Sequence, residues 1–133
     1  MQTKKATRSR SFVLPAASTG HTLSAARGTV AYIGKPAMLV VRRSPHPFQR
    51  RLQGYRRSRN TRLCFDPKGK YLAVVSTSGF WIADLQAKIV RRLDVAPYNG
   101  VVLAVLLSTE ARLLTVLGRS RDGKGLLSTY RLR

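Results

Sequence analysis

The chain has 133 residues, enough for one domain with its own core, and 44% of them are hydrophobic, which argues against wholesale disorder. Lys and Arg number 25 against 5 Asp and Glu, so the formal net charge is +20. A chain this basic repels itself and is expected to meet a polyanion: nucleic acid first, an acidic protein surface second, an anionic membrane third.

The composition also argues against two classes of protein. Cys64 is the single cysteine, so no disulfide framework can form and an intracellular location is expected. The longest apolar run, Val101 to Leu107, is too short for a membrane span and predicts a strand. The N-terminus lacks the continuous apolar segment of a secretory signal. We therefore expect no membrane partner.

Residues 1–20 predict a basic, flexible N-terminal tail ahead of a folded region over residues 21–133. The tail is rich in Lys, Arg, Ser and Thr and contains no acidic residue. A polyanion-binding tail and a mitochondrial transit peptide share this composition, and both interpretations stay open. We expect a nuclear or ribonucleoprotein-associated location, with the mitochondrion as the alternative. The apolar residues from Ser11 to Leu14 could form one further strand.

Short β-rich runs separated by turn residues follow one another after the tail. In chain order, strands are predicted at residues 22–26, 29–33, 37–42, 48–55, 62–65, 71–76, 80–85, 88–95, 101–107, 113–117 and 126–132. Ser44 to Pro47 is expected to form a loop, because proline cannot donate to a strand ladder. Asp66 to Gly69 and Asp122-Gly123 are expected to form tight turns, because glycine readily adopts positive φ.

The run from Tyr71 to Leu85 predicts a hairpin that is buried on both faces, because its apolar residues do not alternate strictly with polar ones. Thr29, Tyr71 and Leu113 begin equivalent strands, and both intervals, 29 to 71 and 71 to 113, are 42 residues. A unit of about 40–45 residues with four strands has the length and strand number of one blade of a WD-type propeller. The residues expected in the core are Leu72, Val74, Trp81, Ile82, Val102, Val105, Leu114 and Val116.

The segment from Phe65 to Leu85 also resembles one blade of a WD-repeat β-propeller. In that family a turn like Asp66–Lys70 leads into the second strand, and a Trp-Asp pair closes the third. Asp84 and Leu85 match the family pattern, whereas Ala83 replaces the Trp, Trp81 falls two residues early, and no Gly-His pair precedes the blade. The family's His-Asp network is therefore not carried over.

The resemblance and the repeat together imply an all-β fold over residues 22–133, a partial β-propeller-like array of about three antiparallel four-stranded blades. Closed propellers have about four to eight blades, and the third unit has no outer strand before Arg133. The chain could be part of a longer propeller, several chains could complete a ring, or a partner could cover the open edges. We expect protein subunits to complete or cover the open blades, because unpaired edges associate.

The sequence predicts no enzyme, cofactor or metal site. Its few carboxylates show no acid–base pairing, and His21, His46 and Cys64 lack metal-ligand spacing. Gly123-Lys124-Gly125 is too short for a phosphate-binding loop and fits a hairpin turn.

Arginines gather between residues 42 and 62, and aromatic residues lie among them. Arginine holds phosphate through a planar fork, and both arginine and aromatic rings stack on exposed bases. On an outer strand and the loop to the next blade, these side chains would form an exposed rim. The predicted nucleic-acid-binding residues are Arg42, Arg43, Arg50, Arg51, Tyr55, Arg56, Arg57, Arg59 and Arg62.

These observations favour a non-catalytic, basic, propeller-like interaction module that acts as a scaffold in a larger assembly and binds RNA through the arginines. The alternative is a scaffold that binds an acidic protein surface, such as tubulin, and has no role with nucleic acid. A third interpretation of the arginines is a solvated basic edge that only discourages strand pairing.

Overall fold

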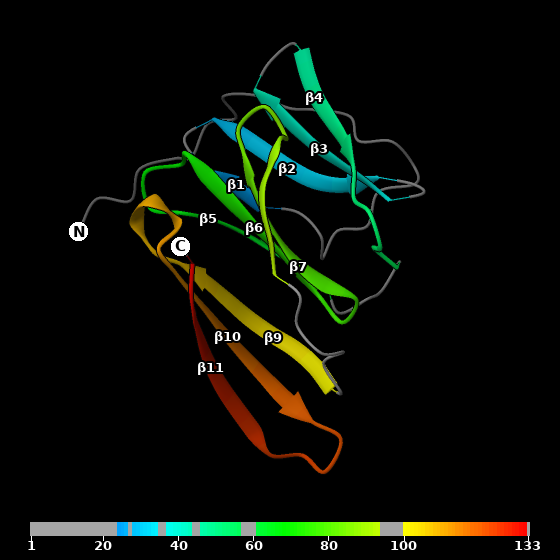
Figure 1. Cartoon of the computed structure of the whole chain (residues 1–133), viewed down its shortest axis with the longest axis vertical. Helices are drawn as coiled ribbons and strands as arrows, with labels where there is room; N and C mark the ends of the chain where they lie inside the picture. Colours follow the sequence, from blue (N-terminus) through cyan, green and yellow to red (C-terminus); the bar gives the residue numbers. More distant parts are fainter. Residues whose placement is uncertain are drawn as a thin grey trace, which may run out of the picture.

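The computed structural model describes residues 24–26, 28–34, 37–43, 46–56, 61–93 and 100–132, and within them the chain is built from antiparallel β-sheets (Figure 1). The first sheet contains β1 (Ser24–Ala26), β2 (Thr29–Gly34), β3 (Met38–Arg43) and β4 (His46–Arg51). The second contains β5 (Arg62–Phe65), β6 (Tyr71–Ser76), β7 (Gly79–Asp84) and β8 (Ile89–Leu93). The third contains β9 (Gly100–Leu107), β10 (Leu113–Ser120) and β11 (Gly125–Arg131).

Within each sheet, neighbouring strands are consecutive in the chain, and no sheet closes on itself. The described residues contain no α-helix; a single 3₁₀ turn, η2 (Thr109–Ala111), joins β9 to β10. The all-β prediction is therefore confirmed, with three separate sheets. The residues of the predicted N-terminal tail lie outside the described part of the chain.

The predicted 42-residue repeat is present in the strands. Thr29, Tyr71 and Leu113 begin β2, β6 and β10, the second strand of each sheet. Gly69 has a φ of 68° in the turn before β6, and Gly123 has a φ of 85° in the turn before β11, as predicted for both turns.

Two predictions around β4 were wrong. His46 and Pro47 belong to β4, where Pro47 lies opposite Arg42, and are not part of a loop. Pro47 is tolerated because β4 is an edge strand of its sheet, where a missing N–H leaves no partner unpaired. The second error is the end of this strand, which was predicted to reach Tyr55. The strand ends at Arg51, and Leu52 and Tyr55 are buried in the following turn.

The second sheet is covered on both faces, because its side chains alternate between two separate apolar clusters. Leu72, Val74 and Trp81 pack with residues of the first sheet, such as Leu39 and Val41. Their neighbours in β6 and β7 point the other way and pack with the third sheet; they are Ala73, Val75, Phe80 and Ile82. All eight residues predicted for the core are buried. The second sheet is thus the middle layer of a stack.

The three sheets contact one another along their first strands. β5 lies between β1 and β9 and contacts both of them, whereas the outer strand β4 lies away from the stack (Figure 1). β5 packs on both of its faces: Leu63 and Phe65 belong to the cluster shared with the first sheet, and Cys64 packs against the cluster shared with the third.

The turn after the first strand repeats between the second and third sheets. The Asp66 amide donates to the Tyr71 carbonyl at 2.9 Å, and 42 residues later the Ser108 amide donates to the Leu113 carbonyl at 2.9 Å. In both turns the side chain of the first residue then accepts backbone N–H groups: Asp66 Oδ1 from Tyr71 at 2.9 Å, and Ser108 Oγ from Leu113 at 2.8 Å. The repeat therefore extends from strand spacing to hydrogen bonding.

Candidate nucleic-acid interface

Four of the predicted arginines lie on the outer half of the first sheet. Arg43, Arg50 and Arg51 are exposed on β3 and β4, and Arg42 is half-buried on β3. Arg50 lies opposite Leu39 and Arg51 opposite Met38, so the two arginines point to different faces of the sheet. This edge strand therefore carries positive charge on both of its faces.

The other predicted arginines lead away from that strand. The Arg56 backbone N–H donates to Ser78 Oγ at 3.1 Å, which attaches the chain after β4 to the β6–β7 turn of the second sheet. Arg62 begins β5 and is half-buried, and its Nη1 donates to the Thr61 carbonyl at 3.2 Å. Arg57 and Arg59 lie outside the described residues. The arginines therefore span two sheets and do not form one compact cluster.

Tyr55 does not occupy the position predicted for it. Its side chain is only 9% exposed, its hydroxyl hydrogen-bonds Thr61 Oγ1 at 2.9 Å, and its ring packs edge-on against Trp81 with centroids 5.9 Å apart. A base could stack on this ring only if the core opened, so Tyr55 is a packing residue. Phe48 lies on β4 among the arginines and is 45% exposed, so its ring is accessible where that of Tyr55 is not.

Arg92 on β8 lies beside Gly54, in the chain that follows β4, and was not predicted from the sequence as a site residue. Its guanidinium lies over the Trp81 ring at 5.6 Å from the centroid, because Arg92 faces Trp81 across the β7–β8 pair. Gly54, with a φ of 80°, leaves room for it: a Cβ at position 54 would stand 2.5 Å from Arg92 Nη2. The sequence feature that could have identified Arg92 is the Arg91-Arg92 pair within the predicted edge strand at residues 88–95.

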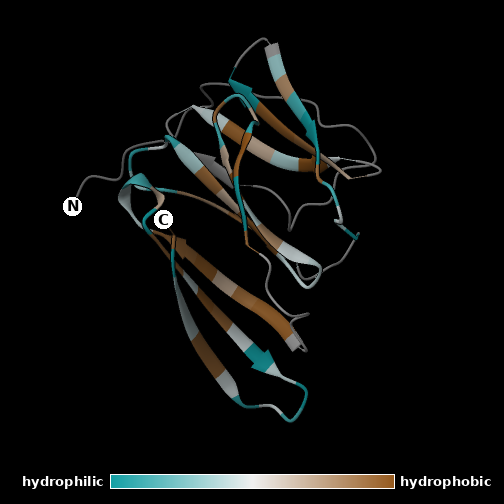
Figure 2. Ribbon diagram, in the orientation of Figure 1, coloured by the Kyte–Doolittle hydropathy of each residue, from teal (hydrophilic) through white to brown (hydrophobic). Residues whose placement is uncertain are grey.

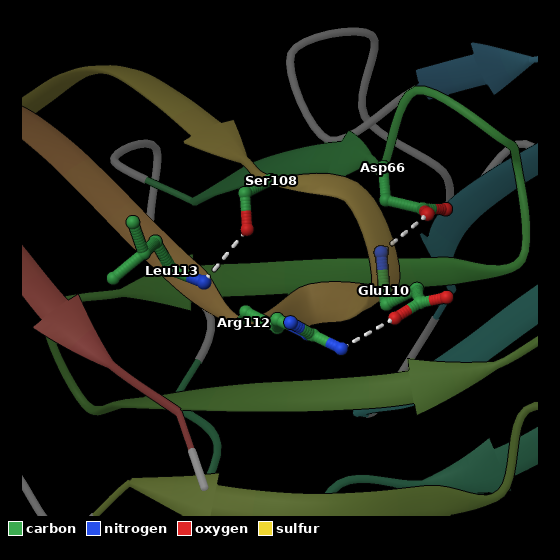
Figure 3. A network of polar contacts seen from close by, with 5 residues as sticks. All are labelled: Asp66, Ser108, Glu110, Arg112 and Leu113. Carbon is green, nitrogen blue, oxygen red and sulfur yellow. Dashed lines mark hydrogen bonds and ion pairs between the residues drawn. The ribbon is translucent and has the colours of Figure 1, made fainter.

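Two hydrogen bonds show that the three sheets are stacked with their equivalent strand ends together. Arg56 bonded to Ser78 joins the end of the first sheet to the β6–β7 turn, and β5 begins at this end. At the opposite end, the Glu110 amide of η2 donates to Asp66 Oδ2 at 3.3 Å and joins the third sheet to the second (Figure 3). The first end carries arginines from all three sheets and is called the arginine end; it holds Arg51, Arg56, Arg62, Arg119 and Arg121.

Acidic side chains are concentrated at the opposite end of the strands. Asp66 accepts backbone N–H groups from Lys70 and Tyr71 at 2.7 and 2.9 Å, and Asp84 accepts those of Gln86 and Lys88, both at 2.9 Å. These two carboxylates are thus used in turns and do not neutralise the arginine end.

Two further acids complete the described set. Glu110 pairs with Arg112 at 3.0 Å, again away from the arginine end (Figure 3). Among the described acidic residues, Asp122 in the β10–β11 turn is the exception, because it lies at the arginine end. A hydrogen bond from Ser120 lowers the pKa of the Asp122 carboxyl below its ordinary value of 3.8.

The described residues offer little that resembles a catalytic centre. No group of three His, Cys, Asp or Glu side chains among them could hold a metal ion. A cavity of about 210 Å³ beside β8 is lined by Tyr71, Ile82, Arg91 and Glu110, among others, and contains one carboxylate, which cannot form an acid–base couple by itself.

The comparisons with known proteins do not assign this chain to a family. No protein-family model and no curated protein matches this chain. Nor do the described residues include a helix long and apolar enough to cross a membrane.

Proposed function

We propose that this chain is a non-catalytic interaction module that binds RNA through its arginine end and acts as a scaffold within a larger, ribonucleoprotein-type assembly. The observation that carries the proposal is the uneven distribution of acidic residues. Arginines of three sheets share one end, where Asp122 is the one described carboxylate, while Asp66, Asp84 and Glu110 are held at the other end. A net charge of +20 supplies the sequence-independent part of the attraction.

The form of the module that we propose is an open, propeller-like array. Three features support it: the 42-residue interval between second strands, the meander order of each sheet, and the contacts among the first strands β1, β5 and β9. An array of three sheets leaves faces and edges for other protein subunits, which fits a scaffold. The surface that would bind RNA is the arginine end, where exposed arginines reach phosphates without disturbing the core.

Salt titration tests the RNA assignment. Contacts to about six to eight phosphates of a single strand give a slope of log K against log salt of roughly −4 to −6. Replacing Arg51, Arg56 and Arg121 together by Ala should make the slope shallower by about 2 and weaken all sequences alike. Fluorescence anisotropy with labelled single-stranded RNA measures both quantities.

A matched control removes equal charge from the opposite end. Lys68, Lys70 and Lys88 are exposed there, and replacing all three by Ala should change the slope much less. Equal changes in the salt slope for the two triple variants would refute the arginine end as the RNA-binding site. Negligible RNA binding of the unsubstituted chain at 150 mM salt would overturn the nucleic-acid assignment and favour an acidic protein partner.

A further inference from the structure

The outward face of the third sheet carries an exposed apolar surface, here called the leucine face. It consists of side chains that alternate with the buried residues of the same strands: Leu106, Leu113, Leu117 and Leu127. Leu106 is 68% exposed and Leu127 is 69% exposed. Figure 2 shows apolar stretches along β9, β10 and β11. Several large apolar side chains exposed side by side on one sheet indicate an interaction surface.

The repeat identifies what normally covers this face. Ala73 and Val75 on β6 are fully buried against the third sheet, and Ala31 and Ile33, 42 residues earlier, pack in the cluster shared with the second sheet. Leu117 lies 42 residues after Val75, so it occupies the equivalent position on a sheet that has no following layer. The equivalent faces of the first and second sheets are each covered by a β-sheet.

The charge around the leucine face selects the partner. Arg119 and Arg131 alternate with the buried residues in the same sense as the leucines, so they border the face, and both are exposed. No acidic residue lies on this face of the described strands. A surface with an apolar centre and a cationic border is complemented by an apolar surface bordered by carboxylates.

A second copy of the chain is a poor fit for two reasons. Packing two leucine faces together would bring the Arg119 and Arg131 side chains of two chains with +20 charge into proximity. Head-to-tail stacking would instead need an open face on the first sheet, but Tyr32 and Val40, which point away from the second sheet, are each only 5% exposed.

We infer that the leucine face docks a β-sheet of a different protein, packed face to face as a fourth layer and presenting apolar residues bordered by Asp or Glu. This inference rests on the proposed scaffold function and specifies its protein partner. The two surfaces share Arg119 alone: the leucines and Arg131 are not part of the arginine end.

A photo-crosslinking amino acid, p-benzoylphenylalanine, placed at Leu127 in the full chain tests the inference in the cells that make the protein. We expect a light-dependent adduct with a different protein, whose crosslinked peptide alternates apolar residues and has Asp or Glu nearby. The same probe at Lys68, an exposed site in the β5–β6 turn, should not give this adduct.

Second substitutions in the Leu127 probe chain report on the two parts of the surface. Leu106→Glu should reduce the adduct at least tenfold, since it places a carboxylate in the apolar centre. Arg131→Glu should reduce it by reversing charge on the border, and Arg131 lies outside the arginine end. Lys68→Glu is the control and should leave the yield unchanged. An unaltered urea-unfolding midpoint for Leu106→Glu, expected because this residue is largely exposed, excludes a folding defect.

Other results would overturn the inference: an adduct at twice the mass of the chain, an adduct removed by nuclease, a crosslinked peptide without acidic neighbours, or no adduct. The RNA titration separates this failure from failure of the proposed function. A chain that binds RNA but gives no Leu127 adduct loses the docking surface alone, whereas an adduct without RNA binding leaves the docking surface and removes the RNA role.

Discussion

The second and third sheets are built on the same plan but differ in how many of their faces are covered. Both are meanders, both begin with a strand in contact with its neighbour's first strand, and both have the same hydrogen-bonded turn after that strand. The second sheet has Leu72, Val75 and Trp81 buried on its two faces, whereas the third exposes Leu106 and Leu127 on one. Equivalent strands are therefore apolar on both faces whether or not the structure covers both.

The difference shows that a strand's hydrophobicity does not report its burial. A residue such as Leu127 belongs to the class of side chains that form cores, and its exposure follows only from the absence of a fourth layer in this chain's described stack. The central sheet should thus carry the stability of the domain, and the open face of the third sheet should contribute little until it is covered.

The largest expected difference comes from the same substitution in the two sheets. Leu72→Ala, at a fully buried site, should lower the free energy of unfolding by about 2–5 kcal/mol, because it removes buried methyl groups and leaves a cavity. Leu127→Ala, at a site 69% exposed, should change it by no more than about 0.5 kcal/mol. Urea unfolding followed by tryptophan fluorescence measures both. Comparable losses would mean that the leucine face is already covered in the isolated chain.

A second comparison uses the equivalent turns. Asp66→Ala should cost about 1–3 kcal/mol, because the buried carboxylate accepts three backbone N–H groups, including that of Glu110 in the next sheet.

The matched change is Ser108→Ala, which removes one bond to an amide in a more exposed turn and should cost about 1 kcal/mol or less. The same urea titration decides between the turns. If Ser108→Ala proved the more damaging, the link between the second and third sheets would not run through Asp66.

The smallest expected effect concerns pH at the tip of the third sheet. The Ser120 hydroxyl holds the pKa of Asp122 below its ordinary value of 3.8, so the ionised carboxylate favours the folded turn. This contribution is present above the ordinary pKa and is lost as the pH falls through the lower pKa of the folded state. Ser120→Ala should raise the Asp122 pKa toward its ordinary value, which carboxyl-carbon NMR titration measures. An unchanged titration would show that the hydroxyl has no such role.

Most of the local structure could be predicted from the sequence. Strand positions, the 42-residue interval, the two-faced burial of the hairpin at Leu72 and Trp81, and the turns at Gly69 and Gly123 all follow from side-chain alternation and turn chemistry. These rules act between residues that are close in the chain. The error at Pro47 arose because a proline can join an edge strand, and the sequence does not show which strand is the edge.

The candidate site was only partly predictable, because its geometry depends on how sheets stack. The stack buries Tyr55 against Trp81, places Arg92 over the same ring, and spreads the arginine run across two sheets. By itself the sequence determined the strands, their repeat and the excess of positive charge, since these depend on residue identity and short-range order. Only the tertiary structure decided which arginines share an end and which leucines stay exposed, because both depend on contacts between sheets, such as those that join residues 22 and 44 positions apart.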